Sequence, residues 1–78
     1  MLWAAQITEP KPLRCVIEQQ TLHSLIPNQP DQLAFYLYVF EATGISYDYL
    51  QDTLEIAKRF AFEKFQVPIS AWQQVEPT

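Results

Sequence analysis

Side chains that could do chemistry are sparse in this chain. Cys15 is the only cysteine and His23 the only histidine, and they stand eight residues apart. A catalytic Cys–His pair needs a third residue to orient the histidine, and the sequence suggests none. Structural zinc needs four Cys or His ligands. One chain offers only two, so such a site would have to be shared between two copies. We therefore expect a buried structural cysteine, a surface histidine and no metal site.

Carboxylates and glycine are equally uninformative about a reaction. Asp48 and Asp52 would lie one turn apart on a helix and could hold a cation weakly, but we favour the interpretation that they belong to a solvated helix face. Gly44 is the only glycine, so the chain has no glycine-rich loop of the kind that holds phosphate groups. The sequence predicts a protein that is not an enzyme and binds no cofactor.

Composition narrows the class of protein and of partner. The 78 residues are 49% hydrophobic and 14% aromatic but only 18% charged, and a chain of this length hides only about 60% of the surface it exposes when unfolded. Nine acidic residues against five basic ones make nucleic acid an unlikely partner. The lone cysteine fits a reducing cytoplasm, and the start "MLWAAQITEPKP" resembles neither a signal peptide nor a membrane anchor. We expect one small cytoplasmic domain, residues 1–78, with no membrane contact.

The clearest helical pattern covers residues 47–66. With one residue about every 100°, the apolar side chains fall on one half of the helix and the charged ones on the other. Ser46 precedes this segment as a candidate N-cap, and Glu55 and Arg59 form a favourable pair four residues apart. Phe62 is the exception, because it falls in the charged half. It is either a lone exposed phenylalanine or, with Phe65, part of a second contact surface.

The stretch "QLAFYLYVFEATG", residues 32–44, has no polar side over the eight residues from Leu33 to Phe40. Pro30 suits the first turn of a helix and Gly44 suits its C-terminal cap, so the pattern favours a helix at residues 30–43. The same residues have high strand propensity, and the periodicity of a short, wholly apolar run cannot distinguish a helix from a strand. A helix that is apolar all round needs cover on every side, which one neighbouring helix cannot give.

The two ends of the chain complete the prediction. Residues 1–29 are rich in proline, and apolar residues alternate on both sides of "TEPKP", which suggests two short extended pieces joined by a turn. Residues 67–78 form a tail in which Trp72 is expected to pack. The predicted fold is mainly α, with a helical hairpin at residues 30–66 as its core and a partly extended N-terminal segment. An α+β fold with an N-terminal β-hairpin is the alternative.

The segment "VFEATGISYDYLQDTLEIAKRF" reads as helix, "TGIS", helix, and so resembles the turn of a helix-turn-helix DNA-binding motif. Gly44 stands at the turn, and Ile45 and Leu50 stand at positions that such motifs bury. The chain departs from the motif at Phe40, where a small residue is usual, and at Asp48, which would repel phosphates. The resemblance implies a DNA-binding or transcription-regulatory protein, which is our alternative function.

The uncovered apolar surface of the 30–43 helix leads to the main functional hypothesis. We predict a small protein-interaction module or adaptor that forms a homodimer or binds another protein through aromatic residues, which are frequent anchors of interfaces. If residues 1–26 do not fold over that helix, its aromatic side chains stay exposed. The predicted partner-binding residues are Phe35, Tyr36, Tyr38, Phe62, Phe65 and Trp72.

Overall fold

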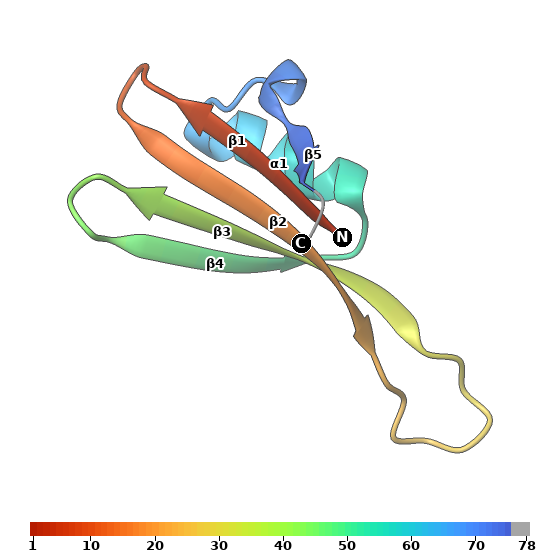
Figure 1. The fold of residues 1–78 in the computed structure, drawn as a ribbon. Coiled ribbons are helices and arrows are strands. Elements are labelled where there is room, and N and C mark those ends of the chain that lie inside the picture. The colour runs from red at the N-terminus through yellow and green to blue at the C-terminus, as the bar shows by residue number, and fades with distance from the viewer. Residues whose placement is uncertain (76–78) are drawn as a thin grey trace.

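A five-stranded antiparallel sheet with a helix on one side makes up the computed structural model, which describes residues 1–75 (Figure 1). The strands lie in the order β4-β3-β2-β1-β5, and every neighbouring pair is antiparallel. The elements along the chain are β1 (Leu2–Ile7), β2 (Leu13–Leu22), β3 (Gln32–Glu41), β4 (Ser46–Gln51), α1 (Leu54–Phe65), the short 3-10 helix η1 (Ile69–Ala71) and β5 (Gln73–Val75).

The prediction of a mainly α fold is wrong, and the largest error is the helix at residues 30–43. This segment is the strand β3, which pairs with β2 on one side and β4 on the other. Gly44 does adopt a positive φ of 91°, but it closes a tight turn between two strands instead of capping a helix. Its N–H donates to the Glu41 carbonyl over 3.0 Å. Proline, aspartate and glycine mark turns as well as helix ends, so the caps were misread, and the aromatic and β-branched content was the better signal.

The predicted helix at residues 47–66 is correct only in its second half. Residues 46–51 form β4, because β3 offers them a strand edge to pair with. The helix begins after Thr53, not after Ser46, and the Thr53 hydroxyl accepts a hydrogen bond from the Ile56 N–H over 3.0 Å. It ends at Phe65, and the C-cap residue Gln66 has a left-handed φ of 61°. The helical hairpin and the helix-turn-helix turn are therefore both absent from residues 1–75, since the chain is extended on both sides of Gly44.

Other local predictions are confirmed. The two extended N-terminal pieces are β1 and β2, and they pair antiparallel around the "TEPKP" turn. The Glu55–Arg59 ion pair forms on the helix surface with an N···O distance of 3.5 Å. Trp72 packs into the core with 8% of its surface exposed. Residues 76–78 of the predicted tail lie outside the described residues.

The core lies between the sheet and α1. Every second residue of the three central strands points toward the helix, and Ile17, Leu37 and Val39 are fully buried there. The inner side of α1 carries Ala57 and Ala61, both fully buried, and such small side chains let a helix lie close to a sheet. The α1–η1 segment then returns the chain to the sheet, where β5 pairs with β1.

The β2–β3 hairpin is longer than its neighbours and extends beyond the body of the protein (Figure 1). We call residues 19–34, which include the connecting loop 23–31, the arm. The arm makes the molecule elongated, with extents of 47 × 24 × 21 Å. Four of its apolar side chains are exposed: Leu22, Leu25, Ile26 and Leu33.

Candidate protein-interaction surface

Strand β3 explains the run of apolar residues that has no polar side. In a strand, successive side chains point to opposite faces of the sheet. Phe35, Leu37 and Val39 point toward α1, and all three are buried. Tyr36 and Tyr38 point the other way and are half-buried. Strands that are apolar on both faces are typical of sheets covered on both sides, yet this sheet has its helix on one side only (Figure 1).

We call the side of the sheet away from α1 the open face. The strand register arranges its side chains in three rows that run across the strands. From β4 toward β5 the rows are Ser46, Phe40, Arg14 and Gln6; then Asp48, Tyr38, Val16, Ala4 and Gln73; and then Leu50, Tyr36, Glu18, Leu2 and Val75. The middle of the face is therefore aromatic and aliphatic, and polar residues lie at its margins.

The aromatic side chains of the open face support one another. The rings of Tyr36 and Tyr38 stack with centroids 6.2 Å apart and an angle of 18° between their planes. The Arg14 guanidinium carbon lies 5.3 Å from the centre of the Phe40 ring, within the range of a cation–π contact. These contacts pack the rings against one another and against Arg14 on the surface of the sheet.

Burial raises the pKa of the Tyr38 hydroxyl, and electrostatic interactions with Glu18, Tyr36 and Asp48 add to the rise. Tyr38 thus stays neutral at physiological pH. A neutral phenol offers a flat apolar ring and one hydroxyl, which is the combination that makes tyrosine frequent at protein interfaces.

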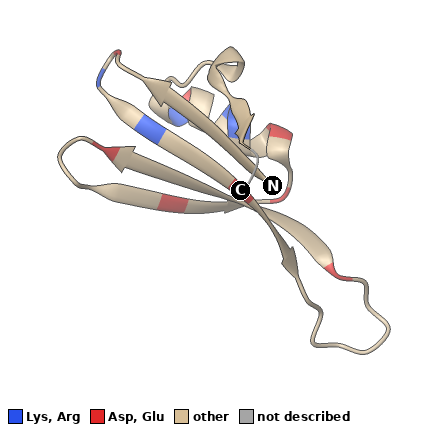
Figure 2. Ribbon diagram, viewed as in Figure 1, with Lys and Arg blue, Asp and Glu red and all other residues tan. Residues whose placement is uncertain are grey.

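The charges of the open face are few and of mixed sign. Among residues 1–75, Arg14, Glu18 and Asp48 are the charged side chains in the three rows. Figure 2 shows the lysines and the other arginine away from these strands, in the β1–β2 turn and on α1. A surface with one positive and two negative groups does not attract a phosphate backbone. This face suits a protein partner better than a nucleic acid.

The six predicted partner-binding residues do not form one surface. Tyr36 and Tyr38 lie together on the open face, as the main hypothesis requires. Phe35 and Trp72 are in the core, with 9% and 8% of their surface exposed. Phe65, the last residue of α1, is half-buried, with its ring 5.9 Å from that of Tyr47. Phe62 is 52% exposed, but on the helix side of the molecule.

Sequence reasoning missed the neighbours of the two tyrosines. Val16 lies directly beside Tyr38, and Leu50 beside Tyr36. Phe40 continues the aromatic row along β3. The signal that could have found them is the period-two alternation of β3, combined with that of the strand "LRCVIEQQTL" next to it.

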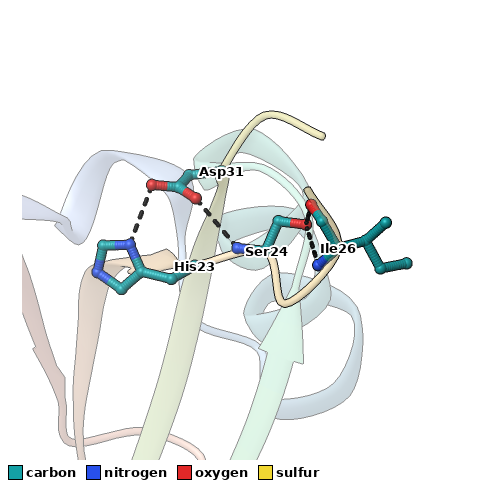
Figure 3. Close-up of polar contacts among 4 residues, drawn as sticks. All are labelled: His23, Ser24, Ile26 and Asp31. Atoms are coloured by element: carbon teal, nitrogen blue, oxygen red, sulfur yellow. Dashed lines mark hydrogen bonds and ion pairs between the residues drawn. The ribbon is translucent and has the colours of Figure 1, made fainter. Parts of the chain in front are cut away.

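The chemically active side chains are kept apart. Cys15 is fully buried in the sheet, and burial raises the pKa of its thiol to about 11, so the nucleophilic thiolate is scarce at neutral pH. His23 lies in the exposed arm, with its Nδ1 atom 3.0 Å from a carboxylate oxygen of Asp31 (Figure 3). Asp48 and Asp52 are not one helical turn apart, because β4 carries Asp48. No group of three or more potential metal ligands occurs within residues 1–75.

The hollow beside the start of β2 shows the same lack of convergent chemistry. It has a volume of about 310 Å³ and is lined by Lys11, Lys64 and aromatic residues of β4 and α1. Both ammonium groups are already engaged: Lys11 pairs with Glu41 over 2.7 Å, and Lys64 lies 5.3 Å from the centre of the Tyr49 ring. Neither lysine is positioned as a base or a nucleophile.

Comparison of the chain with protein-family models, with curated proteins and with solved structures found no match. Within residues 1–75, no helix has both the length and the apolar character needed to cross a membrane.

Proposed function

We propose that this protein is a small protein-interaction module and that the open face of its sheet is the binding surface. The observation that carries the proposal is the second apolar side of β3. Tyr36, Tyr38 and Phe40 form an aromatic row on a sheet face over which no element of residues 1–75 packs. A strand that is apolar on both faces is typical of a sheet that is covered on both sides, so a partner on the open face would supply the missing cover for β3.

The composition of the face supports a protein partner in particular. Aromatic residues are enriched at the centres of protein interfaces and charged residues are depleted there. An aromatic sheet face is also typical of domains that bind single-stranded nucleic acid, but those domains line the strand's path with basic residues. Here Glu18 and Asp48 flank the tyrosines, and Arg14 alone opposes them. The alternative of a DNA-binding protein has also lost the helix-turn-helix unit on which it depended.

We place the protein in a reducing compartment, the cytoplasm. Cys15 is its only cysteine, and it is buried in the sheet where it forms no disulfide.

The experiment that tests the proposed function is site-specific photo-crosslinking in cells. Tyr38 is replaced by the photoreactive amino acid benzoylphenylalanine, which is also aromatic. A matched control places the same amino acid at Phe62, which is exposed on the opposite side of the molecule. The proposal predicts protein adducts from position 38 and none from position 62. Adducts from position 62 alone, or no adduct from either position, would refute it.

A further inference from the structure

The open face is complementary to itself in charge and in side-chain size. The proposed function, on which this inference rests, does not require that property. We propose that its occupant is a second copy of the same chain, packed face to face about a two-fold axis that runs parallel to the strands between β2 and β3. Such an axis lays β2 of one copy over β3 of the other, and β1 over β4.

The charges of the face fit this arrangement. Asp48, Tyr38, Val16 and Ala4 stand in one row, so the axis places Asp48 over Ala4 of the partner subunit. Arg14 falls on the partner's Phe40, which repeats the cation–ring contact it makes within its own chain at 5.3 Å. Glu18 falls on the partner's Tyr36, whose hydroxyl can donate to the carboxylate. No two like charges meet.

The sizes of the side chains fit as well. Strand β3 presents large aromatic rings, whereas β2 and β1 present Val16 and Ala4 in the same row. Laying β2 over β3 sets the smaller Val16 against the ring of the partner's Tyr38. Alternation of large and small residues lets two sheets interdigitate at their ordinary separation of about 10 Å.

A two-fold axis across the strands is the competing arrangement, and it is worse on two counts. It places Asp48 opposite Asp48 of the partner subunit, which sets two carboxylates against each other. It also sends the two arms in opposite directions. The axis along the strands brings the arms side by side, which gives the exposed Leu25 and Ile26 a neighbouring apolar surface.

The flat overlap supplies about half of the area that a specific interface usually buries. Under the proposed axis the four strands β1 to β4 overlap, and strands about 4.8 Å apart and about six residues long give roughly 19 by 20 Å in projection. That is about 380 Å² against roughly 800 Å² per partner, so the relief of the side chains and the contact between the arms must supply the rest.

The first test is the molar mass in solution, measured by light scattering over a concentration range of about a hundredfold. We expect dimers in the wild type at the upper end of the range. Tyr38→Glu should raise the dimer dissociation constant at least about thirtyfold, as the loss of a central interface residue does. Leu50→Lys, at a position that is 52% exposed and so tolerant of charge, should weaken the dimer without harming the fold. Phe62→Glu should leave the dimer intact.

The second test fixes the axis by cysteine cross-linking. Val16→Cys and Tyr38→Cys variants are mixed and treated with a short bismaleimide, and the buried Cys15 serves as a silent background. The proposed axis predicts adducts between the two different variants. Adducts of each variant with itself would indicate the crossed axis and overturn our arrangement.

The results also separate this inference from the proposed function. A wild type that is monomeric throughout, or a dimer indifferent to both Tyr38→Glu and Leu50→Lys, overturns the second copy as occupant. If position 38 still forms photo-adducts with another protein, the open face remains a binding surface for that protein.

Discussion

Truncation to alanine should cost much more stability at residue 37 than at its neighbour, residue 38, because β3 points the two side chains to opposite faces of the sheet. Leu37 is fully buried against α1, whereas Tyr38 lies on the open face. Leu37→Ala removes three buried carbon atoms and leaves a cavity, which costs about 2 to 5 kcal/mol of unfolding free energy. A domain of this length has about 4 to 12 kcal/mol in total, so the variant should be close to unfolding.

Tyr38→Ala should cost the isolated monomer much less. It removes the stack with Tyr36 and the cross-strand contacts with Val16 and Asp48, and such pairs contribute about 0.2 to 1 kcal/mol each. The ring is only half-buried, so little transfer free energy is lost with it. We expect a total loss of about 1 to 2 kcal/mol, although the loss of assembly should be nearly complete.

Urea unfolding followed by tryptophan fluorescence measures both costs, since Trp3 and Trp72 pack against or within the core. The protein is kept dilute, because assembly would add apparent stability to the wild type. With a urea m-value of about 1 kcal/mol/M, Leu37→Ala should lower the urea midpoint by about 2 to 5 M, and Tyr38→Ala by about 1 to 2 M. Equal losses for the two variants would mean that the side chains of residues 37 and 38 lie in similar environments, which would contradict their placement on opposite faces of β3.

Three further predictions follow from local contacts. Thr53→Ala should remove about 1 kcal/mol and lower the melting temperature by about 4 to 8 °C, whereas Thr53→Asp should keep the N-cap; equal melting curves for Thr53→Ala and the wild type would exclude that cap. Cys15, with its pKa raised to about 11, should react with a thiol reagent at pH 8 only after unfolding, so rapid labelling of the native protein would contradict its burial. Hydrogen bonds from the Ser24 backbone N–H and from His23 lower the pKa of Asp31 below its usual 3.8. These arm contacts should therefore be fully present above pH 3.8 and be lost as the pH falls through the lowered pKa. A Ser24 amide NMR signal that stays constant over that fall in pH would count against them.

The sequence predicted individual features of this fold better than its class. The alternation around "TEPKP" identified β1 and β2, and the spacing of Glu55 and Arg59 identified the real part of the helix. These signals are local, so a local reading suffices for them. The class was missed because β3 and β4 are specified by their pairing with other strands, which residues 30–51 do not reveal by themselves.

The residues of the candidate site could be predicted only in part, again because strand pairing is not visible in a local segment. The aromatic run led to the prediction that Tyr36 and Tyr38 bind a partner, because a run that is apolar on every side needs cover in a helix or a strand alike. The structure puts both residues on the open face, and their role there stays a prediction. Phe35 was grouped with them because a helix does not separate adjacent residues as a strand does, and the structure puts it in the core. Arg14 and Val16 were out of reach, because their place on the same face follows from the β2–β3 register.

Intermolecular nuclear Overhauser effects would show whether the open faces of two copies pack against each other. A sample that mixes isotope-labelled and unlabelled chains, recorded with isotope filtering, reports only contacts between copies. We expect cross-peaks between the Val16 methyl groups of one copy and the Tyr38 ring protons of the other, along the row where these residues stand. Intermolecular peaks confined to Phe62 and the outer side of α1, or none at concentrations where the wild type is a dimer, would contradict that packing.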